Sequence, residues 1–149
     1  MMPIVKILNY DELYFDSCLK LFDENCPSYF AENEKEDYID FLKVNPPGYF
    51  VGTIESCIVS AFGLIAELDA SRGRLSWILA SPESEGKGLG GKMMAFVKNS
   101  AIEKELVAID IAASHLSAPF FKKFGAEELK KTNDGWGQGM HRVDMELKL

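Results

Sequence analysis

The apolar residues in the first third of the chain recur at helical spacing after one short strand. A strand is predicted at residues 5–8, followed by a helix over 11–25 in which Phe15 and Phe22 share one face. A second helical pattern covers 33–44. Prolines directly after both helical segments prevent either helix from continuing.

From Tyr49 the pattern changes to that of β-strands joined by short polar turns. The predicted strands cover residues 49–53, 57–67 and 74–80. Consecutive strands joined in this way form an antiparallel meander. Nucleotide-binding α/β folds instead alternate strands with helices before their phosphate loop, so the pattern argues against those folds.

Helices and a strand alternate in the next part of the chain. A helix follows the meander after a glycine-rich turn, and an apolar strand is predicted at 106–112. A helix is predicted within 114–124, where Gly125 serves as its C-terminal cap. A second glycine-rich turn at 134–139 precedes a final strand at 140–149, whose apolar and polar residues alternate.

The composition is that of one globular domain, which we expect to cover residues 1–149. No apolar run is long enough to cross a membrane, and the N-terminus lacks a secretory signal. A net charge of −7 without a basic cluster argues against nucleic-acid binding. The cysteines Cys18, Cys26 and Cys57 lack metal-ligand spacing, so we expect reduced thiols, a cytoplasmic protein and no bound metal.

The candidate chemistry lies where the third strand of the meander meets the following helix. Four glycines stand there within six residues, accompanied by Lys87 and Lys92: Gly86, Gly88, Gly90 and Gly91. The first N–H groups of a helix have no intrahelical partner, and the helix dipole makes that end partly positive. Glycines let a phosphate approach several of these N–H groups at once. The sequence therefore predicts a site for a phosphorylated ligand, most naturally a diphosphate.

Two nucleotide-binding patterns compete for this segment. Gly86–Gly91 fits the dinucleotide fingerprint GxGxxG, with Asp110 near the place of a ribose-binding acid. Gly86–Lys92 fits the phosphate-loop pattern GxxxxGK, but Met93 stands where that loop needs a hydroxyl for its metal. Both folds need further strand–helix units, and too little chain follows the glycines to supply them.

A third pattern fits better. The segment Ile78–Lys92 resembles the acetyl-CoA-binding motif of the GNAT superfamily of N-acetyltransferases, and Gly88 and Gly90 match its two small positions. The sequence departs from the motif at Glu85, where the family prefers Arg or Gln.

A second GNAT motif, which runs roughly Asn-x-x-Ala-x-x-Phe-Tyr-x-x-x-Gly-Phe, resembles residues 114–126. Ser114 falls at its Asn position, Phe120 matches its Phe, and Phe121 replaces its Tyr. In many members the hydroxyl of that Tyr protonates the departing thiolate.

The resemblance implies an α+β fold with a central mixed, largely antiparallel sheet of six to seven strands and about four flanking helices. It implies that acetyl-CoA donates an acetyl group to a primary amine of a small molecule or peptide by direct attack in a ternary complex. The cofactor-binding residues that it implies are Ile78, Leu79, Ala80, Gly86, Lys87, Gly88, Leu89, Gly90, Gly91, Ser114 and Phe121.

Acetyl transfer to an amine also requires a base, because a free alkylamine has a pKa near about 10.4. The candidate bases are Glu67, Asp110 and His141. The GNAT resemblance implies that backbone N–H groups of the strand around Leu79 and Ala80 donate to the developing oxyanion.

The two departures from the family pattern keep a second hypothesis open. With Glu85 and Phe121, the same fold could form a CoA-binding regulatory or interaction module with little turnover. A homodimer is possible for either hypothesis.

Overall fold

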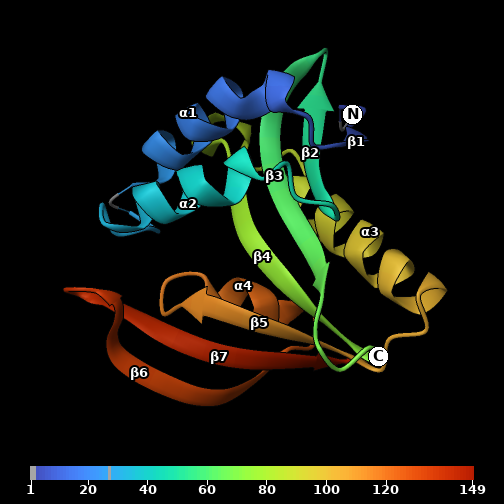
Figure 1. Cartoon of the computed structure of the whole chain (residues 1–149), viewed down its shortest axis with the longest axis vertical. Coiled ribbons are helices and arrows are strands. Elements are labelled where there is room, and N and C mark those ends of the chain that lie inside the picture. The colour runs from blue at the N-terminus through green and yellow to red at the C-terminus, as the bar shows by residue number, and fades with distance from the viewer. Residues whose placement is uncertain (1–2, 27) are drawn as a thin grey trace.

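The computed structural model describes residues 3–26 and 28–149. Its seven strands form one sheet in the order β1-β2-β3-β4-β5-β7-β6 (Figure 1). The strands are β1 (Lys6–Asn9), β2 (Tyr49–Ile54), β3 (Cys57–Ala66), β4 (Arg72–Ala80), β5 (Ala108–Ser114), β6 (Glu127–Gly137) and β7 (Met140–Lys148). The α-helices are α1 (Phe15–Asn25), α2 (Glu34–Lys43), α3 (Leu89–Glu103) and α4 (Ala118–Lys123). Every strand pair is antiparallel except β4–β5, which confirms the mixed, largely antiparallel sheet.

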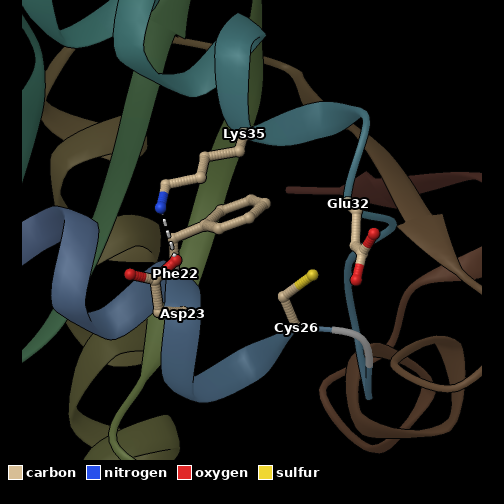
Figure 2. Close-up of a pocket in the computed structure, with 5 residues that line it drawn as sticks. All are labelled: Phe22, Asp23, Cys26, Glu32 and Lys35. Carbon is tan, nitrogen blue, oxygen red and sulfur yellow. Dashed lines mark ion pairs between the residues drawn. The ribbon is translucent and has the colours of Figure 1, made fainter.

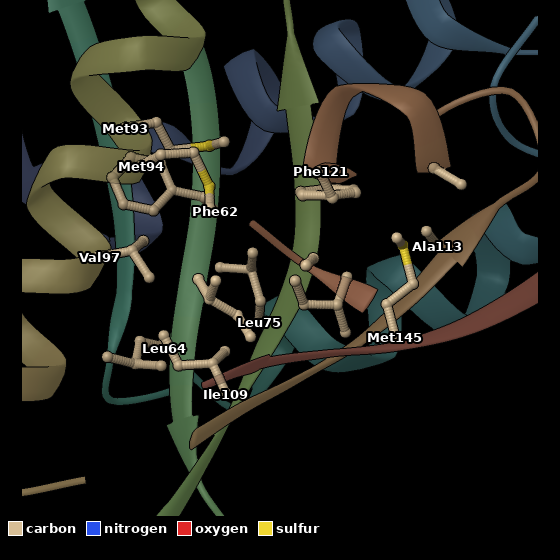
Figure 3. Close-up of a cluster of buried hydrophobic side chains, with 14 of the residues drawn as sticks. Phe62, Leu64, Leu75, Met93, Met94, Val97, Ile109, Ala113, Phe121 and Met145 are labelled. Atoms are coloured by element: carbon tan, nitrogen blue, oxygen red, sulfur yellow. The ribbon is translucent and has the colours of Figure 1, made fainter. Parts of the chain in front are cut away.

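Helices cover both faces of the sheet, and each face has its own core. On one face, α1 and α2 pack on β2–β4 around Phe22, Tyr38 and Leu79. On the other face, α3 and α4 enclose a second cluster that includes Val97 and Phe121 (Figure 3). None of the helices in the described ranges is long and apolar enough to span a membrane.

Several boundaries and one whole strand differ from the sequence prediction, and β4, for example, begins at Arg72 and not at residue 74. β5 begins at Ala108 and extends to Ser114, so Ser114 ends a strand and does not open α4. The turn predicted at 134–139 is shorter, because β6 continues to Gly137. No sequence pattern predicted β6, whose residues 127–135 are exposed on both faces of the sheet.

The sheet opens between its two parallel strands. Pairing between β4 and β5 covers only Arg72–Leu75 and Ala108–Ile111, and beyond these residues the two strands point in different directions (Figure 1). The backbone of β4 after Leu75 therefore has no partner strand on the β5 side. This opening lies beside the start of α3, which follows β4 in the chain.

An irregularity in β4 lies at the same opening. Ala61 pairs with Leu79, and Gly63 pairs with Ser76. Between these pairs β3 has one residue and β4 has two, so β4 contains one extra residue. Trp77 takes up this bulge with a φ of +46°, which a bulky side chain adopts only under structural constraint. The bulge moves the Trp77 side chain to the α1–α2 face of the sheet.

Candidate functional site

The start of α3 is an open, glycine-lined helix end. Gly88 is the N-cap residue in the left-handed conformation (φ +73°), and no side chain caps the helix. No acidic residue lies in the first turn, and Gly86 and Lys87 are exposed. The Lys92 ammonium donates to the Pro3 carbonyl at 2.9 Å and so holds the N-terminal segment beside this helix end. An uncapped helix start of this kind can accept an anion.

The glycines at this helix end serve different purposes. A Cβ at Gly90 would lie 2.5 Å from Cε1 of Phe120, so Gly90 is required by packing between α3 and α4. A Cβ at Gly86 or Gly91 would meet nothing within 4 Å. The open side of the loop is therefore formed by Gly86 and Gly91, where a ligand can approach the backbone.

The unpaired edge of β4 presents backbone donors to the same region. Ser81 donates its N–H to β3, and Leu79 lies opposite Ala61 in the same ladder. Because bonding directions alternate along an antiparallel ladder, Leu79 directs its N–H to β3, whereas Ile78 and Ala80 direct theirs to the unpaired edge. The Leu79 side chain is buried at 1% exposure. The predicted strand residues thus differ: Ile78 and Ala80 offer donors, and Leu79 contributes packing.

The last two predicted cofactor residues lie in or beside the core. The Ser114 hydroxyl exchanges hydrogen bonds with Ser117, which orders the turn between β5 and α4. The Phe121 ring is 3% exposed and packs in the cluster shown in Figure 3, near Ala113 and Met145. A phenyl ring buried in this position packs in the core and cannot donate a proton.

Two of the candidate bases, Glu67 and Asp110, meet in one ion-pair cluster on β4, β5 and β7. Arg72 donates to both oxygens of Asp110, at 2.6 and 3.1 Å, and also pairs with Glu146. Arg74 donates to Glu67 at 3.2 Å. The cluster lies at the closed end of the β4–β5 pair, where the strands are still hydrogen-bonded.

The pKa values of the two carboxyl groups are shifted in opposite directions within this cluster. The hydrogen bond with Arg72 lowers the pKa of Asp110, although partial burial opposes it. The hydrogen bond with Asp110, followed by burial, raises the pKa of Glu67. Asp110 is therefore the weaker base of the two, and Glu67 holds a proton more readily.

The third candidate base, His141, lies apart from this cluster. It shares its side of β7 with Val143, whereas Glu146 faces the other side. The Nδ1 of His141 accepts the backbone N–H of Asp134 at 3.0 Å. The backbone N–H of His141 donates to Nδ1 of His115 at 3.2 Å. The two imidazole rings, 4.7 Å apart, join the β6–β7 turn to the end of β5.

Two hollows adjoin the α1–α2 loop, and Glu32 lines both. One has a volume of about 310 Å³ and contains the Asp23–Lys35 ion pair on one side, with Cys26 and Glu32 on the other (Figure 2). Burial raises the pKa of the Cys26 thiol, which lowers its thiolate fraction relative to a free cysteine.

The second hollow, of about 390 Å³, lies between the α1–α2 loop, the β5–α4 turn and the β6–β7 turn. Its lining residues are Ala31, Glu32, Asn33, His115, Leu116, Gln138, Gly139 and Met140. The Asn33 amide donates to the Trp136 carbonyl at 3.1 Å, and the Trp136 indole donates to the Ala113 carbonyl at 2.9 Å. These bonds hold three separate segments around one opening, which the sequence patterns did not reveal.

No group of three or more His, Cys, Asp or Glu side chains that could hold a metal ion occurs in the part of the chain that the structure describes.

A family model matches most of the chain, and several solved structures share its fold. Residues 15–126 match the sequence model described as "Acetyltransferase (GNAT) family". No curated protein matches the chain in sequence. Among solved structures, Ard1 from Thermoplasma volcanium is similar with a TM-score of 0.82 at 12% identity, covering 97% of both chains.

Two further structures share the fold over nearly the whole chain. The ribosomal-protein-S18-alanine N-acetyltransferase from Escherichia coli has a TM-score of 0.78 at 12% identity, covering 97% of this chain and 94% of the other. An aminoglycoside 6'-N-acetyltransferase complexed with coenzyme A has a TM-score of 0.76 at 9% identity, covering 97% and 96%.

Proposed function

This chain belongs to the acetyltransferase (GNAT) family, and we propose that it transfers the acetyl group of acetyl-CoA to a primary amine of a small molecule or peptide. One observation carries the proposal. The uncapped, glycine-lined start of α3 lies next to an edge of β4 that has lost its partner strand. An anion and an extended chain can therefore bind side by side.

The two parts of this site would hold different parts of acetyl-CoA. The diphosphate would accept the N–H groups of Gly86 and of Gly88 to Gly91. The Lys87 N–H already donates to the Ser84 carbonyl at 3.1 Å, and its side chain would add positive charge. The pantetheine arm would lie along β4, where Ile78 and Ala80 offer free N–H groups. The residues fit this ligand, since no acidic side chain occupies the first turn of α3.

The transfer follows from these contacts. The neutral amine nitrogen attacks the thioester carbonyl carbon and forms the new C–N bond, and the C–S bond then breaks. The oxyanion that develops meanwhile would accept a strand N–H. The nitrogen loses its proton to a base, and the sulfur leaves with the electron pair of the broken bond.

We propose Glu67 as this base. Because Glu67 lies at the closed end of the β4–β5 pair, whereas Ile78 and the second hollow lie at the open end, the proton would reach it through a chain of waters. Its pKa is raised, whereas the Arg72 contact makes Asp110 a poorer acceptor of protons. His141 lies on the other side of the sheet and remains a weaker candidate. Phe121 cannot protonate the sulfur, so CoA would leave as a thiolate; a free thiol has a pKa of about 8.5, which makes this feasible near neutral pH.

The acceptor would enter through the second hollow, next to His115 at the end of β5. The Glu32 carboxylate at its edge suits a cationic amine. Two of the proteins with similar structures are an alanine N-acetyltransferase and an aminoglycoside N-acetyltransferase, and both names denote amine-bearing acceptors. A cytoplasmic location and a homodimer remain predictions of the sequence.

The test is release of free CoA thiol from acetyl-CoA in the presence of polyamines, amino acids, aminoglycosides and peptides with free N-termini. The proposal predicts saturable, acceptor-dependent release for one of these classes. The buried phenyl group of Phe121 favours one alternative, a CoA-binding regulatory module. Saturable acetyl-CoA binding with no release for any class would favour the module.

A further inference from the structure

A row of buried polar groups leads from α1 to the back of β4. Tyr38 and Tyr49 are 0% and 1% exposed, and their hydroxyl oxygens lie 2.8 Å apart. The Tyr49 hydroxyl donates to the Trp77 carbonyl at 2.6 Å. Cys18 of α1 is fully buried in the same core as Tyr38.

These hydrogen bonds have one direction. Tyr49 has a single hydroxyl proton and gives it to the Trp77 carbonyl, so Tyr38 must be the donor to Tyr49. Burial raises the pKa of both phenols, which therefore stay protonated donors. Each bond in such a chain polarises the next, and the accumulated effect falls on one backbone carbonyl.

That carbonyl belongs to the bulge in β4. With φ at +46°, Trp77 turns its carbonyl out of the β3–β4 ladder and toward the buried tyrosines. The Trp77 side chain is packed against Tyr38, with ring centroids 4.9 Å apart. Several buried groups therefore determine the orientation of this one peptide bond.

The same peptide carries the N–H of Ile78. Because a peptide is planar and trans, this N–H points opposite to the Trp77 carbonyl. It therefore points away from Tyr49 and toward the unpaired edge of β4, as the alternation of the ladder also requires. A hydrogen bond accepted by the carbonyl makes the N–H of the same peptide a stronger donor.

We propose that Tyr49 is a positioning residue for acetyl transfer. Its hydroxyl, supported by that of Tyr38, fixes and polarises the Trp77–Ile78 peptide so that the Ile78 N–H donates to the thioester carbonyl oxygen. This inference rests on the proposed function, because it assigns the oxyanion donor of that reaction. Tyr49 itself touches neither the acetyl group nor the amine.

The thioester carbonyl reports this hydrogen bond directly. We would bind acetyl-CoA labelled with ¹³C at the acetyl carbonyl and record isotope-edited infrared difference spectra. The wild-type protein should shift the carbonyl stretch to lower frequency relative to free acetyl-CoA. In Tyr49→Phe the shift should fall by at least half, while Kd for acetyl-CoA changes by less than about threefold, because most contacts are made elsewhere.

Tyr10→Phe provides a matched control. Tyr10 is buried and packs edge-on against the Tyr49 ring, 5.8 Å between centroids, but its hydroxyl has no hydrogen-bond partner among the described residues. The Tyr10→Phe substitution removes a phenol oxygen next to the Tyr38–Tyr49–Trp77 hydrogen-bond chain, which we call the Tyr49 relay, without breaking that chain. Its infrared shift should equal that of the wild type.

Kinetics with an active acceptor supply a second readout. Tyr49→Phe should lower kcat by about 10- to 100-fold with little change in KM for acetyl-CoA, since the lost interaction strengthens only as the oxyanion forms. Should Tyr49→Phe not fold, Tyr38→Phe keeps the Trp77 contact but removes its support. Tyr38→Phe should lose a smaller part of the shift, and a shift equal to wild type would overturn the relay.

The outcomes separate the two proposals. An unchanged infrared shift in folded Tyr49→Phe that still binds acetyl-CoA overturns the positioning role and leaves the proposed function intact. A wild-type protein that does not bind acetyl-CoA overturns the proposed function and this inference together.

Discussion

The side-chain amide of Asn25 donates to the backbone carbonyl of Ala80 at 2.9 Å. The same amide nitrogen donates to Leu21 within α1 at 2.7 Å, and the side chain is only 6% exposed. The last turn of α1 is thereby fixed to the last residue of β4, directly before the loop that leads to α3. One buried amide thus joins the α1–α2 side of the molecule to the candidate cofactor site.

Replacing this amide should weaken both the fold and the site. Asn25→Ala leaves two carbonyl groups without their donor, which should lower the free energy of unfolding by about 1–3 kcal/mol. Acetyl-CoA affinity should fall as well, because the end of β4 loses its anchor. Asp23→Ala on the same helix removes only an exposed ion pair, and its urea midpoint should stay near that of wild type. Equal midpoints for the two variants would refute the anchoring role.

Gly90 and Gly91 allow a paired test of the helix start. Gly90→Ala forces its methyl group against Phe120, whose ring is held between Phe121 and Phe124, and should destabilise the protein by about 1 kcal/mol or more. Gly91→Ala meets no neighbour and should stabilise it by about 0.5 kcal/mol. Thermal unfolding of both variants measures the difference. A destabilised Gly91→Ala would show that this position is less open than the structure indicates.

The ion-pair cluster predicts how stability depends on acid. Arg72 lowers the pKa of Asp110 in the folded state, so this contribution is present above the unfolded pKa of about 3.9 and is lost as pH falls through the lower folded value. Arg72→Met should therefore lose stability at pH 7 and begin to unfold at a higher pH during acidification. Urea unfolding between pH 7 and pH 2 tests this, with Lys35→Met, whose ion pair is exposed, as control. Parallel acid profiles for wild type and Arg72→Met would contradict it.

Activity should identify the base through its pH profile. Deprotonated Glu67 is the active form, so the rate should rise with pH through its raised pKa. Glu67→Gln should lower kcat by about 10- to 100-fold and abolish that rise. Asp110→Asn removes the main cause of the raised pKa and should move the rise to lower pH.

His141 lies on the other side of the sheet, so His141→Gln should leave unchanged the pH at which the rate rises. If Glu67→Gln keeps the wild-type rise, Glu67 is not the base.

The sequence predicted the elements whose side chains face a core. The helical faces of α1 and α3 and the meander β2–β4 are visible as apolar periodicities, because burial on one side imposes them. β6 was not predicted because its residues 127–135 bury no side chain on either face, so no apolar periodicity marks it. Its strand structure comes from the backbone ladder with β7, which leaves no period in the sequence.

The site was predictable where a single segment builds it. Gly86 to Gly91 form a helix start from local chain alone, and their pattern is readable. The bulge at Trp77 lies in an unbroken apolar run, and only pairing with β3 makes it necessary. The Tyr49 relay and the Glu67–Asp110 contact join residues distant in sequence, so no spacing reveals them.

The central claim is that backbone N–H groups at the start of α3 hold the diphosphate of acetyl-CoA. Nuclear magnetic resonance of ¹⁵N-labelled protein, titrated with acetyl-CoA and separately with acetylated pantetheine, tests it most directly. With acetyl-CoA, the amide protons of Gly86 and of Gly88 to Gly91 should move downfield with one saturable affinity, as expected for donors to phosphate. Acetylated pantetheine lacks the diphosphate and should shift Ile78 and Ala80 only. Saturable acetyl-CoA binding that leaves the Gly86–Gly91 amides unmoved would contradict the account.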